Sequence, residues 1–158
     1  MPELDKTWWH EAPLAVILQE ARRAYVQRVR AGLAGGGMGD MPHQGARVVA
    51  GIQHNGTNAR DVSAELGISK QAVSKLIDSL VDLDYVERVP DPDDRRVVTI
   101  GLTERGRAAA TIVKEAVDSV DEELLAKIGE EGAFGMRRGL AMLIGIAYQD
   151  RQRTSATE

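Results

Sequence analysis

Cysteine is absent from this chain of 158 residues. Its absence excludes a disulfide framework, a cysteine nucleophile and a thiolate metal site. The chain also lacks an apolar run long enough to span a membrane and a secretory pattern at its N-terminus, so we expect a cytoplasmic protein without a membrane partner. Catalytic signatures are missing as well: there is no H-E-x-x-H, no G-x-S-x-G and no paired acid and base at a meaningful spacing. We therefore expect neither an enzyme nor a bound metal or other cofactor.

Basic residues are not in excess, since the formal net charge is −4. Nucleic-acid-binding proteins often carry a basic surplus. The segment from Thr57 to Arg107, which carries the motifs described next, has no such surplus either. Any binding to DNA must therefore depend on where a few cations point. The length favours one domain with a substantial core.

A helix, a tight turn and a second helix are predicted in the middle of the chain. Asn58 suits a helix N-cap, and the first helix ends at Gly67, the residue type that accepts a positive φ at a helix C-terminus. Ser69 then caps a second helix over Lys70–Leu83, whose apolar residues recur at three- and four-residue spacing. A glycine-containing turn between two helices is the helix-turn-helix signature.

The polar face of the second predicted helix is the candidate DNA-reading surface. In a DNA-reading helix the N-terminal side chains reach the base edges. Glutamine can bind adenine through two hydrogen bonds, lysine can reach guanine or phosphate, and serine can serve either purpose. An ordinary solvated face would carry the same residue types, and taken alone the helix favours that interpretation. The candidate DNA contacts on this helix are Ser69, Lys70, Gln71, Ser74 and Lys75.

A β-hairpin with a charged tip is predicted directly after this helix. Tyr85–Val89 and Val97–Leu102 have β-branched, partly alternating strand character. The tip Pro90–Arg96 is rich in turn residues and ends in Arg95 and Arg96. Two arginines on a rigid hairpin can enter a minor groove, whose negative potential attracts them. A solvated turn with local ion pairs is the alternative, but it does not explain why the tip follows a helix-turn-helix.

The two motifs together resemble a known family. The run G-I-S-K-Q-A-V-S-K-L-I-D-S-L, followed by Y-V-E-R-V-P-D-P-D-D-R-R-V-V-T-I-G-L-T-E-R-G, is similar to the winged helix-turn-helix of the MarR family of bacterial transcription regulators. The D-P-D-D-R-R wing and the L-T-E-R-G that starts the next helix are its most specific parts. The resemblance implies a homodimer on a pseudo-palindromic operator. It places Ser69, Gln71, Ser74 and Lys75 in the major groove, and Arg96 in the minor groove with Asp94 as its orienting partner.

The N-terminal part is predicted to form a long amphipathic helix, a connector and a short helix. The long helix covers Trp8–Leu33, its regular part begins near Pro13, and it serves either as a dimerisation surface or as intramolecular core. The glycine-rich stretch Gly32–Met41 lacks the endings of phosphate-binding loops and is expected to be a flexible connector. A short helix over His43–His54 follows, with Asp40 as its cap.

Two further helices are predicted after the hairpin. Thr103 caps the first, Glu104–Ile128, which Gly129–Gly132 breaks. The second covers about Ala133–Gln149, and its stretch Leu140–Tyr148 is apolar nearly all round. A small monomer would struggle to bury such a stretch, so it indicates subunit contact.

The predicted fold is mostly α with a small β-hairpin wing. It is a winged helix-turn-helix flanked by dimerisation helices at both ends of the chain. The expected divisions are an N-terminal dimerisation helix and connector over residues 1–41, a DNA-binding domain over residues 42–103 and C-terminal dimerisation helices over residues 104–158. Two copies would meet an operator whose inverted half-sites have centres about 34 Å apart.

The resemblance and the expected geometry predict a dimeric, sequence-specific transcriptional regulator, with repression as the commoner mode. Regulators of the family often bind small aromatic or phenolic compounds between the dimer helices and the wing domain, which implies a repressor that such a ligand releases. Aromatic or polar side chains near the expected junction are the pocket candidates: Trp8, Trp9, Tyr25 and His43. The alternative function is a winged helix that binds a protein partner and no DNA.

Overall fold

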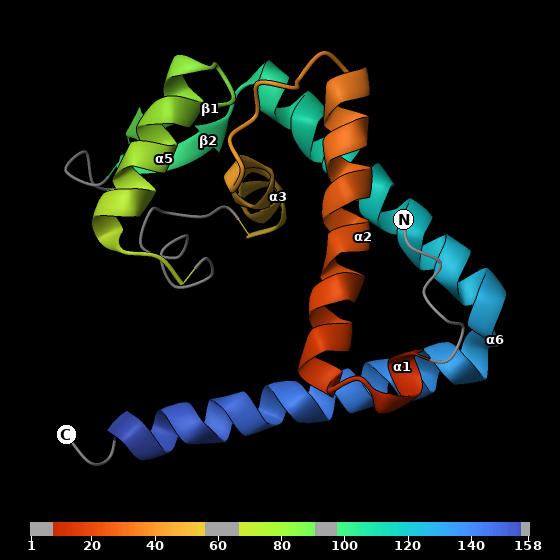
Figure 1. Ribbon diagram of the computed structural model, residues 1–158. Coiled ribbons are helices and arrows are strands. Elements are labelled where there is room, and N and C mark those ends of the chain that lie inside the picture. The colour runs from red at the N-terminus through yellow and green to blue at the C-terminus, as the bar shows by residue number, and fades with distance from the viewer. Residues whose placement is uncertain (1–7, 56–66, 91–97, 156–158) are drawn as a thin grey trace. The chain divides into compact units, whose positions relative to one another are not determined.

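The computed structural model describes residues 8–55, 67–90 and 98–155. The predicted first helix of the helix-turn-helix, residues 58–66, and the tip of the wing lie outside these ranges. The described elements are mostly helical, with one two-stranded antiparallel sheet (Figure 1). In chain order they are α1 (Trp8–Glu11), α2 (Leu14–Gly35), α3 (Gly45–Asn55), α5 (Lys70–Asp82), β1 (Val86–Pro90), β2 (Val98–Leu102) and α6 (Glu104–Ser155).

The chain divides by its contacts into two compact units, Met1–Asp118 and Ser119–Glu158. The first unit holds α1 to β2 and the first turns of α6, and the second holds the remainder of α6. The division of the sequence at residues 41 and 103 concerns function and stays a prediction. In the described ranges no helix has an apolar stretch sufficient to cross a bilayer.

The N-terminal helix is divided at Pro13, close to where its regular part was predicted to begin. At its other end α2 continues into the glycine-rich stretch and closes with two paired bonds. The amide of Gly37, whose φ is 75°, donates to the carbonyl of Ala34, and the amide of Met38 donates to the carbonyl of Leu33. This pattern is a Schellman motif, in which the flanking apolar pair packs together. Leu33 and Met38 accordingly both lie in the core.

The next helix begins two residues later than predicted. α3 starts at Gly45, and Asp40 lies too far upstream to cap it. The predicted capping role of Asp40 was therefore wrong, and its carboxylate binds two side chains from distant elements instead. Val49 on α3 is fully buried, and its neighbours Val48 and Ile52 are buried too.

The second helix of the helix-turn-helix forms as predicted. Gly67 has a φ of 64°, and the Ser69 hydroxyl caps α5 by accepting a hydrogen bond from the Ala72 amide at 3.2 Å. α5 ends at Asp82, one residue before the predicted end. Its buried residues Val73, Ile77 and Leu80 recur at the expected spacing, so the opposite face is left to solvent.

The wing strands start where the sequence predicted them within one residue. β1 and β2 pair antiparallel with Val86 opposite Leu102 and Pro90 opposite Val98. Asp84, with a φ of 59°, turns the chain sharply between α5 and β1. This turn carries Tyr85 into the core of the first unit, where it is fully buried.

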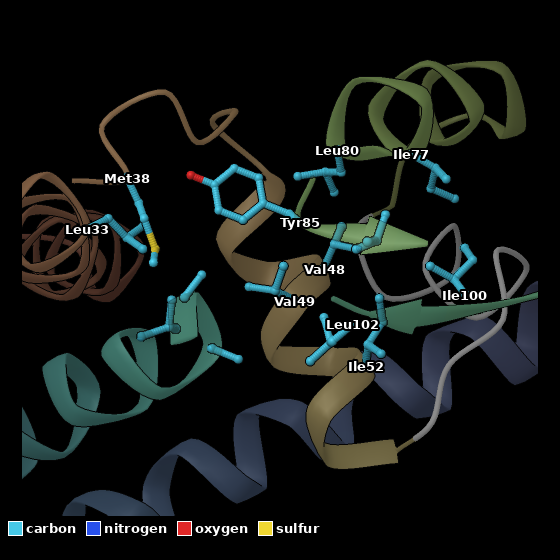
Figure 2. Packing of buried hydrophobic residues seen from close by; sticks show 14 of the residues in the cluster. Leu33, Met38, Val48, Val49, Ile52, Ile77, Leu80, Tyr85, Ile100 and Leu102 are labelled. Atoms are coloured by element: carbon cyan, nitrogen blue, oxygen red, sulfur yellow. The ribbon is translucent and has the colours of Figure 1, made fainter. Parts of the chain in front are cut away.

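One hydrophobic core holds the first unit together. Figure 2 shows side chains of α2, α3, α5 and the hairpin converging around Tyr85. Ala109, Ala110 and Val113 supply the α6 side of this core. α3, α5 and the hairpin thereby share one apolar interior with the ends of two long helices.

The last helix begins at a cap and contains one break. Thr103 accepts a hydrogen bond from the Gly106 amide at 3.0 Å, as its predicted capping role requires. Gly129 is non-helical, with φ 69° and ψ 174°, so the predicted break exists. It is confined to this one glycine, because α6 resumes directly after it and continues to Ser155, beyond the predicted end at Gln149.

Candidate nucleic-acid interface and cavity

The exposed face of α5 carries all five helix residues that the sequence predicted as DNA contacts. Lys70, Gln71, Ser74 and Lys75 are exposed, and they lie opposite the buried face of the helix. Ser69 is exposed as well, and its hydroxyl caps the helix. Because that hydroxyl accepts a hydrogen bond from the backbone, its own proton remains available to a phosphate oxygen.

The wing residues predicted to contact DNA, Arg95 and Arg96 with Asp94, lie outside the described residues. The strands on either side of them are described and paired, so the hairpin base is in place. An ion pair that the sequence analysis missed joins this base to the reading helix, since Arg88 on β1 binds Asp78 on α5. Both side chains are about half exposed, and such a pair adds little stability.

A cavity of about 670 Å³ lies in the first unit, between α2, the connector, α3 and the first part of α6. Two of the predicted pocket residues, Tyr25 and His43, line it, whereas Trp8 and Trp9 are not among its lining residues. Apolar side chains make most of its wall, including Val29, Met38, Met41, Ala46, Val113 and Val117. The volume falls in the range of small-molecule sites.

The polar lining of the cavity is cationic. Arg22, Arg30 and Arg47 contribute to the wall, and none of the described lining residues is acidic. Arg30 donates a hydrogen bond to Nδ1 of His43. An arginine can only donate, so Nδ1 of His43 is the acceptor in this contact.

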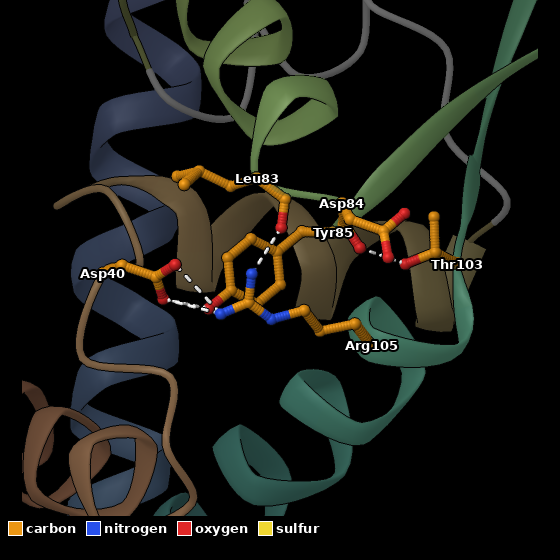
Figure 3. A network of polar contacts seen from close by, with 6 residues as sticks. All are labelled: Asp40, Leu83, Asp84, Tyr85, Thr103 and Arg105. Carbon is orange, nitrogen blue, oxygen red and sulfur yellow. Dashed lines mark hydrogen bonds and ion pairs between the residues drawn. The ribbon is translucent and has the colours of Figure 1, made fainter.

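A polar cluster ties the connector to the base of the wing (Figure 3). The Tyr85 hydroxyl donates to Oδ1 of Asp40 at 2.7 Å, and the Arg105 guanidinium donates to both carboxylate oxygens of Asp40 at 2.9 Å. The guanidinium also lies 4.3 Å from the centre of the Tyr85 ring. We call Asp40, Tyr85 and Arg105 the Asp40 cluster.

The Asp40 cluster also reaches the C-terminal end of α5. Arg105 donates to the backbone carbonyl of Leu83 at 2.6 Å, and Thr103 donates to that of Asp84 (Figure 3). Four segments meet here: the connector, the end of α5, the start of β1 and the start of α6. The predicted site residues included none of the cluster, because its members are far apart in the sequence.

Comparison with known proteins points to one family. Residues 40–97 match the sequence model of the MarR family. Over this segment the chain is similar to the MarR family. This segment includes α3, α5 and β1, and it begins at the connector residue Asp40. The matched family is one of transcriptional regulators and not of enzymes.

Solved structures of MarR-family proteins have the same fold. FabT of Streptococcus pneumoniae in complex with DNA has 25% identity and a TM-score of 0.72, with 86% of this chain and 93% of that chain covered. The S. aureus MepR–DNA complex has 18% identity and a TM-score of 0.70, with 85% and 96% covered. The reduced form of MarR from E. coli has 20% identity and a TM-score of 0.66, with 84% and 96% covered. The search of curated proteins found no match.

Protonation equilibria at the Asp40 cluster are shifted. The hydrogen bonds from Tyr85 and then Arg105 hold the pKa of the Asp40 carboxyl below its usual value. Burial, followed by the hydrogen bond to Asp40, raises the pKa of Tyr85 to about 12. The bond to Asp40 also raises the pKa of Arg105. The cluster therefore holds a carboxylate, a neutral phenol and a guanidinium at neutral pH.

Alkaline pH is expected to destabilise the protein through Tyr85. The phenol ionises near pH 10 in the unfolded chain and near pH 12 in the folded protein, so its contribution is complete below pH 10 and is lost as the pH rises towards 12. The full contribution is on the order of 2–3 kcal/mol. Urea unfolding across this range should show the fall in the wild type and a smaller fall in Tyr85→Phe. Parallel falls in both proteins would contradict the prediction, and exposed Tyr148→Phe is the control.

Proposed function

We propose that this protein is a homodimeric, sequence-specific transcriptional regulator that binds duplex DNA. The observation that carries the proposal is the exposed polar face of α5, which is capped at Ser69 and lies in a segment that matches the MarR family. A β-hairpin follows this helix directly. FabT and MepR, which have the same fold, were both solved with DNA. Repression by blocking the polymerase is the mode that we propose.

The proposed contacts divide between the two grooves. Ser69, Gln71, Ser74 and Lys75 bind in the major groove, where glutamine can identify adenine, and Lys70 binds guanine or phosphate. In the wing, Arg96 enters the minor groove with Asp94 orienting it, and Arg95 lies beside it. Because few cations contribute and the protein is acidic overall, we expect modest non-specific affinity. A dimer that makes several phosphate contacts should still lose affinity steeply with salt.

A second copy of the chain completes the proposed binding unit. The unit Ser119–Glu158 exposes a series of large apolar side chains on α6, and such a surface is typical of subunit contact. In a two-fold symmetric dimer we expect the two α5 helices to bind successive major grooves. The operator is therefore expected to be pseudo-palindromic, with half-site centres about 34 Å apart.

Charge reversal at the proposed contacts is expected to abolish specific binding. Lys75→Glu and Arg96→Glu each replace an attraction to phosphate or base by a repulsion in both half-sites, so the affinity for the operator should fall about 100-fold. Gln71→Ala should weaken binding by an amount that depends on the base it faces. Mobility-shift titration against the DNA upstream of its own gene measures these effects. Arg23→Glu, at an exposed position on α2 outside the unit Ser119–Glu158, changes the net charge equally and should leave the affinity unchanged.

The alternative function, a winged helix that binds a protein partner, makes the opposite prediction. The wild-type protein would then show no salt-sensitive binding to that upstream DNA, and Arg96→Glu would leave its weak DNA affinity untouched. The same titration therefore separates the two functions. The exposed face of α5 favours DNA over a protein partner, because this face is polar and contains two lysines.

We further propose that a small aromatic or phenolic ligand releases the repressor from DNA. The cavity supports this proposal because it has an apolar wall, Tyr25 and His43 in its lining, and three arginines that suit an acidic group. Trp8 and Trp9 do not line it, and Trp9 is 51% exposed. We propose that the two tryptophans are covered by the second subunit and reach a ligand only in the dimer.

Salicylate, a phenol with a carboxylate, is the probe for this proposal. A ligand can release DNA only if it binds the DNA-free arrangement more tightly, so salicylate should raise the melting temperature of the free protein and weaken its operator affinity together. Phenol, which lacks the carboxylate, should do both less strongly because it does not pair with the arginines. If salicylate changes neither quantity at millimolar concentration, the phenolic ligand class is excluded for this protein.

A further inference from the structure

The connector between α2 and α3 has two sides with different roles. Met38, Gly39 and the stretch Met41–Gln44 line the cavity. Asp40, which lies between these lining residues in sequence, does not line the cavity and holds Tyr85 and Arg105 instead. Any guest that displaces this connector from the cavity side must therefore move the residue that anchors the base of the wing.

Asp40 holds the base of the wing through several hydrogen bonds. A single carboxylate accepts three hydrogen bonds, one from the Tyr85 hydroxyl and two from the Arg105 guanidinium. The partners lie 45 and 65 residues further along the chain, so only tertiary structure brings them to Asp40. Such charge-assisted bonds depend strongly on geometry. A small displacement of the connector would break several of them together.

The partners of Asp40 also contact the end of α5, the helix that is proposed to bind DNA. Arg105 also donates a hydrogen bond to the backbone carbonyl of Leu83, where α5 ends. Tyr85 directly precedes β1, the first strand of the wing. Asp84 between them has a φ of 59°, a conformation that a non-glycine residue keeps only when its surroundings hold it. The Asp40 cluster therefore surrounds the junction that sets the direction of the wing relative to α5.

The connector also has the freedom to move. Gly37, with a φ of 75°, and Gly39 flank Met38, and a side chain added at Gly37 would meet no atom within 4 Å. Such positions can absorb changes of backbone angle. These two glycines therefore allow the backbone angles of the connector to change when a guest displaces it.

We propose that Asp40 is a positioning residue that transmits occupancy of the cavity to the junction between α5 and the wing. A guest in the cavity displaces the connector, the carboxylate leaves Tyr85 and Arg105, and the junction is freed. This inference rests on the proposed function for its link to DNA, but its first step, from the cavity to Tyr85, concerns the protein alone. The coupling works only if the guest binds the displaced arrangement more tightly.

A covalent guest tests the proposal without knowledge of the natural ligand. The chain has no cysteine, so Ala46→Cys places a single thiol in the cavity wall. Benzyl methanethiosulfonate converts this thiol to a mixed disulfide and releases methanesulfinate, which leaves an apolar ring in the cavity. Dithiothreitol removes the ring again. Ala31→Cys, at an exposed site on α2 outside the cavity, is the matched control.

Two measurements distinguish the step from the cavity to Tyr85 from the step from Tyr85 to DNA binding. Incorporation of 3-fluorotyrosine gives fluorine NMR signals for the three tyrosines, and the Tyr85 signal is identified by its loss in Tyr85→Phe. Labelling of Ala46→Cys should shift this signal, and dithiothreitol should restore it. Operator affinity, measured on the same samples, should fall about tenfold in the Ala46→Cys protein and stay unchanged in Ala31→Cys.

Asp40→Asn decides whether the carboxylate is the transmitter. In the Asp40→Asn background the ring should no longer alter the Tyr85 signal or the operator affinity, because the anchor is already weakened. If this variant does not fold, Tyr85→Phe, which keeps the buried ring, should reduce the response of operator affinity. An unmoved Tyr85 signal on labelling overturns the proposal, as does an equal loss of affinity with and without the Asp40 carboxylate. A shifted Tyr85 signal in a protein that binds no DNA supports the coupling and refutes the proposed function.

Discussion

Replacing Gly106 by alanine is expected to remove most of the stability of the unit Met1–Asp118. A Cβ at this position would lie 1.9 Å from the carbonyl oxygen of Tyr85 and 3.0 Å from its carbonyl carbon. These are backbone atoms, so no rotamer change relieves the overlap. The same carbonyl accepts a hydrogen bond from the Thr103 amide at 3.3 Å, and this bond fixes the carbonyl between the wing and α6. Either α6 or the hairpin must therefore move away from the core.

The expected loss is about 3 kcal/mol or more, because overpacking against backbone exceeds the usual cost of an inserted methyl group. Urea unfolding followed by circular dichroism measures it. Gly35→Ala, at the last residue of α2, is the control: its added Cβ meets no atom within 4 Å and should leave the unfolding midpoint unchanged or slightly raised. A Gly106→Ala protein that unfolds at the wild-type midpoint would show that the close approach of α6 to Tyr85 is wrong.

Ile144→Glu is expected to separate the proposed dimer and with it abolish operator binding. Within the unit Ser119–Glu158, Phe134 is 69% exposed, Met142 61% and Ile144 59%. Apolar side chains at this exposure are stable in water only if they are few or if another surface covers them. A charge in the middle of such a patch costs far more in a buried interface than on a free surface.

The wild-type protein should sediment as a dimer, and Ile144→Glu should sediment as a folded monomer. Operator affinity should fall at least about 100-fold, because one half-site contributes only part of the binding energy. Gln27→Glu on α2 adds the same charge at an exposed polar position and should change neither mass nor affinity. A wild-type protein that is monomeric at micromolar concentration would refute the proposed assembly, and no variant would be needed.

Local chemistry explains which parts of the fold were predictable. Gly67 could be placed at a positive φ because few other residues accept one. Ser69 and Thr103 could be identified as helix caps because their hydroxyls satisfy amides only a few residues away. The break at Gly129 follows the same rule. Each of these features depends on neighbours in the sequence, and none requires knowledge of the rest of the chain.

Asp40 shows where that reasoning fails. An aspartate shortly before a helix is a good cap by local rules, but here Tyr85 and Arg105 compete for the carboxylate and hold it through three bonds. A guanidinium and a buried hydroxyl offer stronger partners than a solvent-exposed helix end does. His43 is a similar case, because its role depends on Arg30 thirteen residues away. The cavity itself has no local signature at all.

The sequence alone determined that the chain has a helix-turn-helix with a wing, which residues of α5 face away from the core, and where the helices are capped, because periodicity and capping operate within one or two turns. Only the tertiary structure decided that the connector carries Asp40 to the base of the wing, that α6 passes so close to Tyr85 that position 106 admits no Cβ, and that Tyr25 and His43 share a cavity with three arginines. These features depend on contacts between segments distant in sequence, and such contacts exist only once the core has formed.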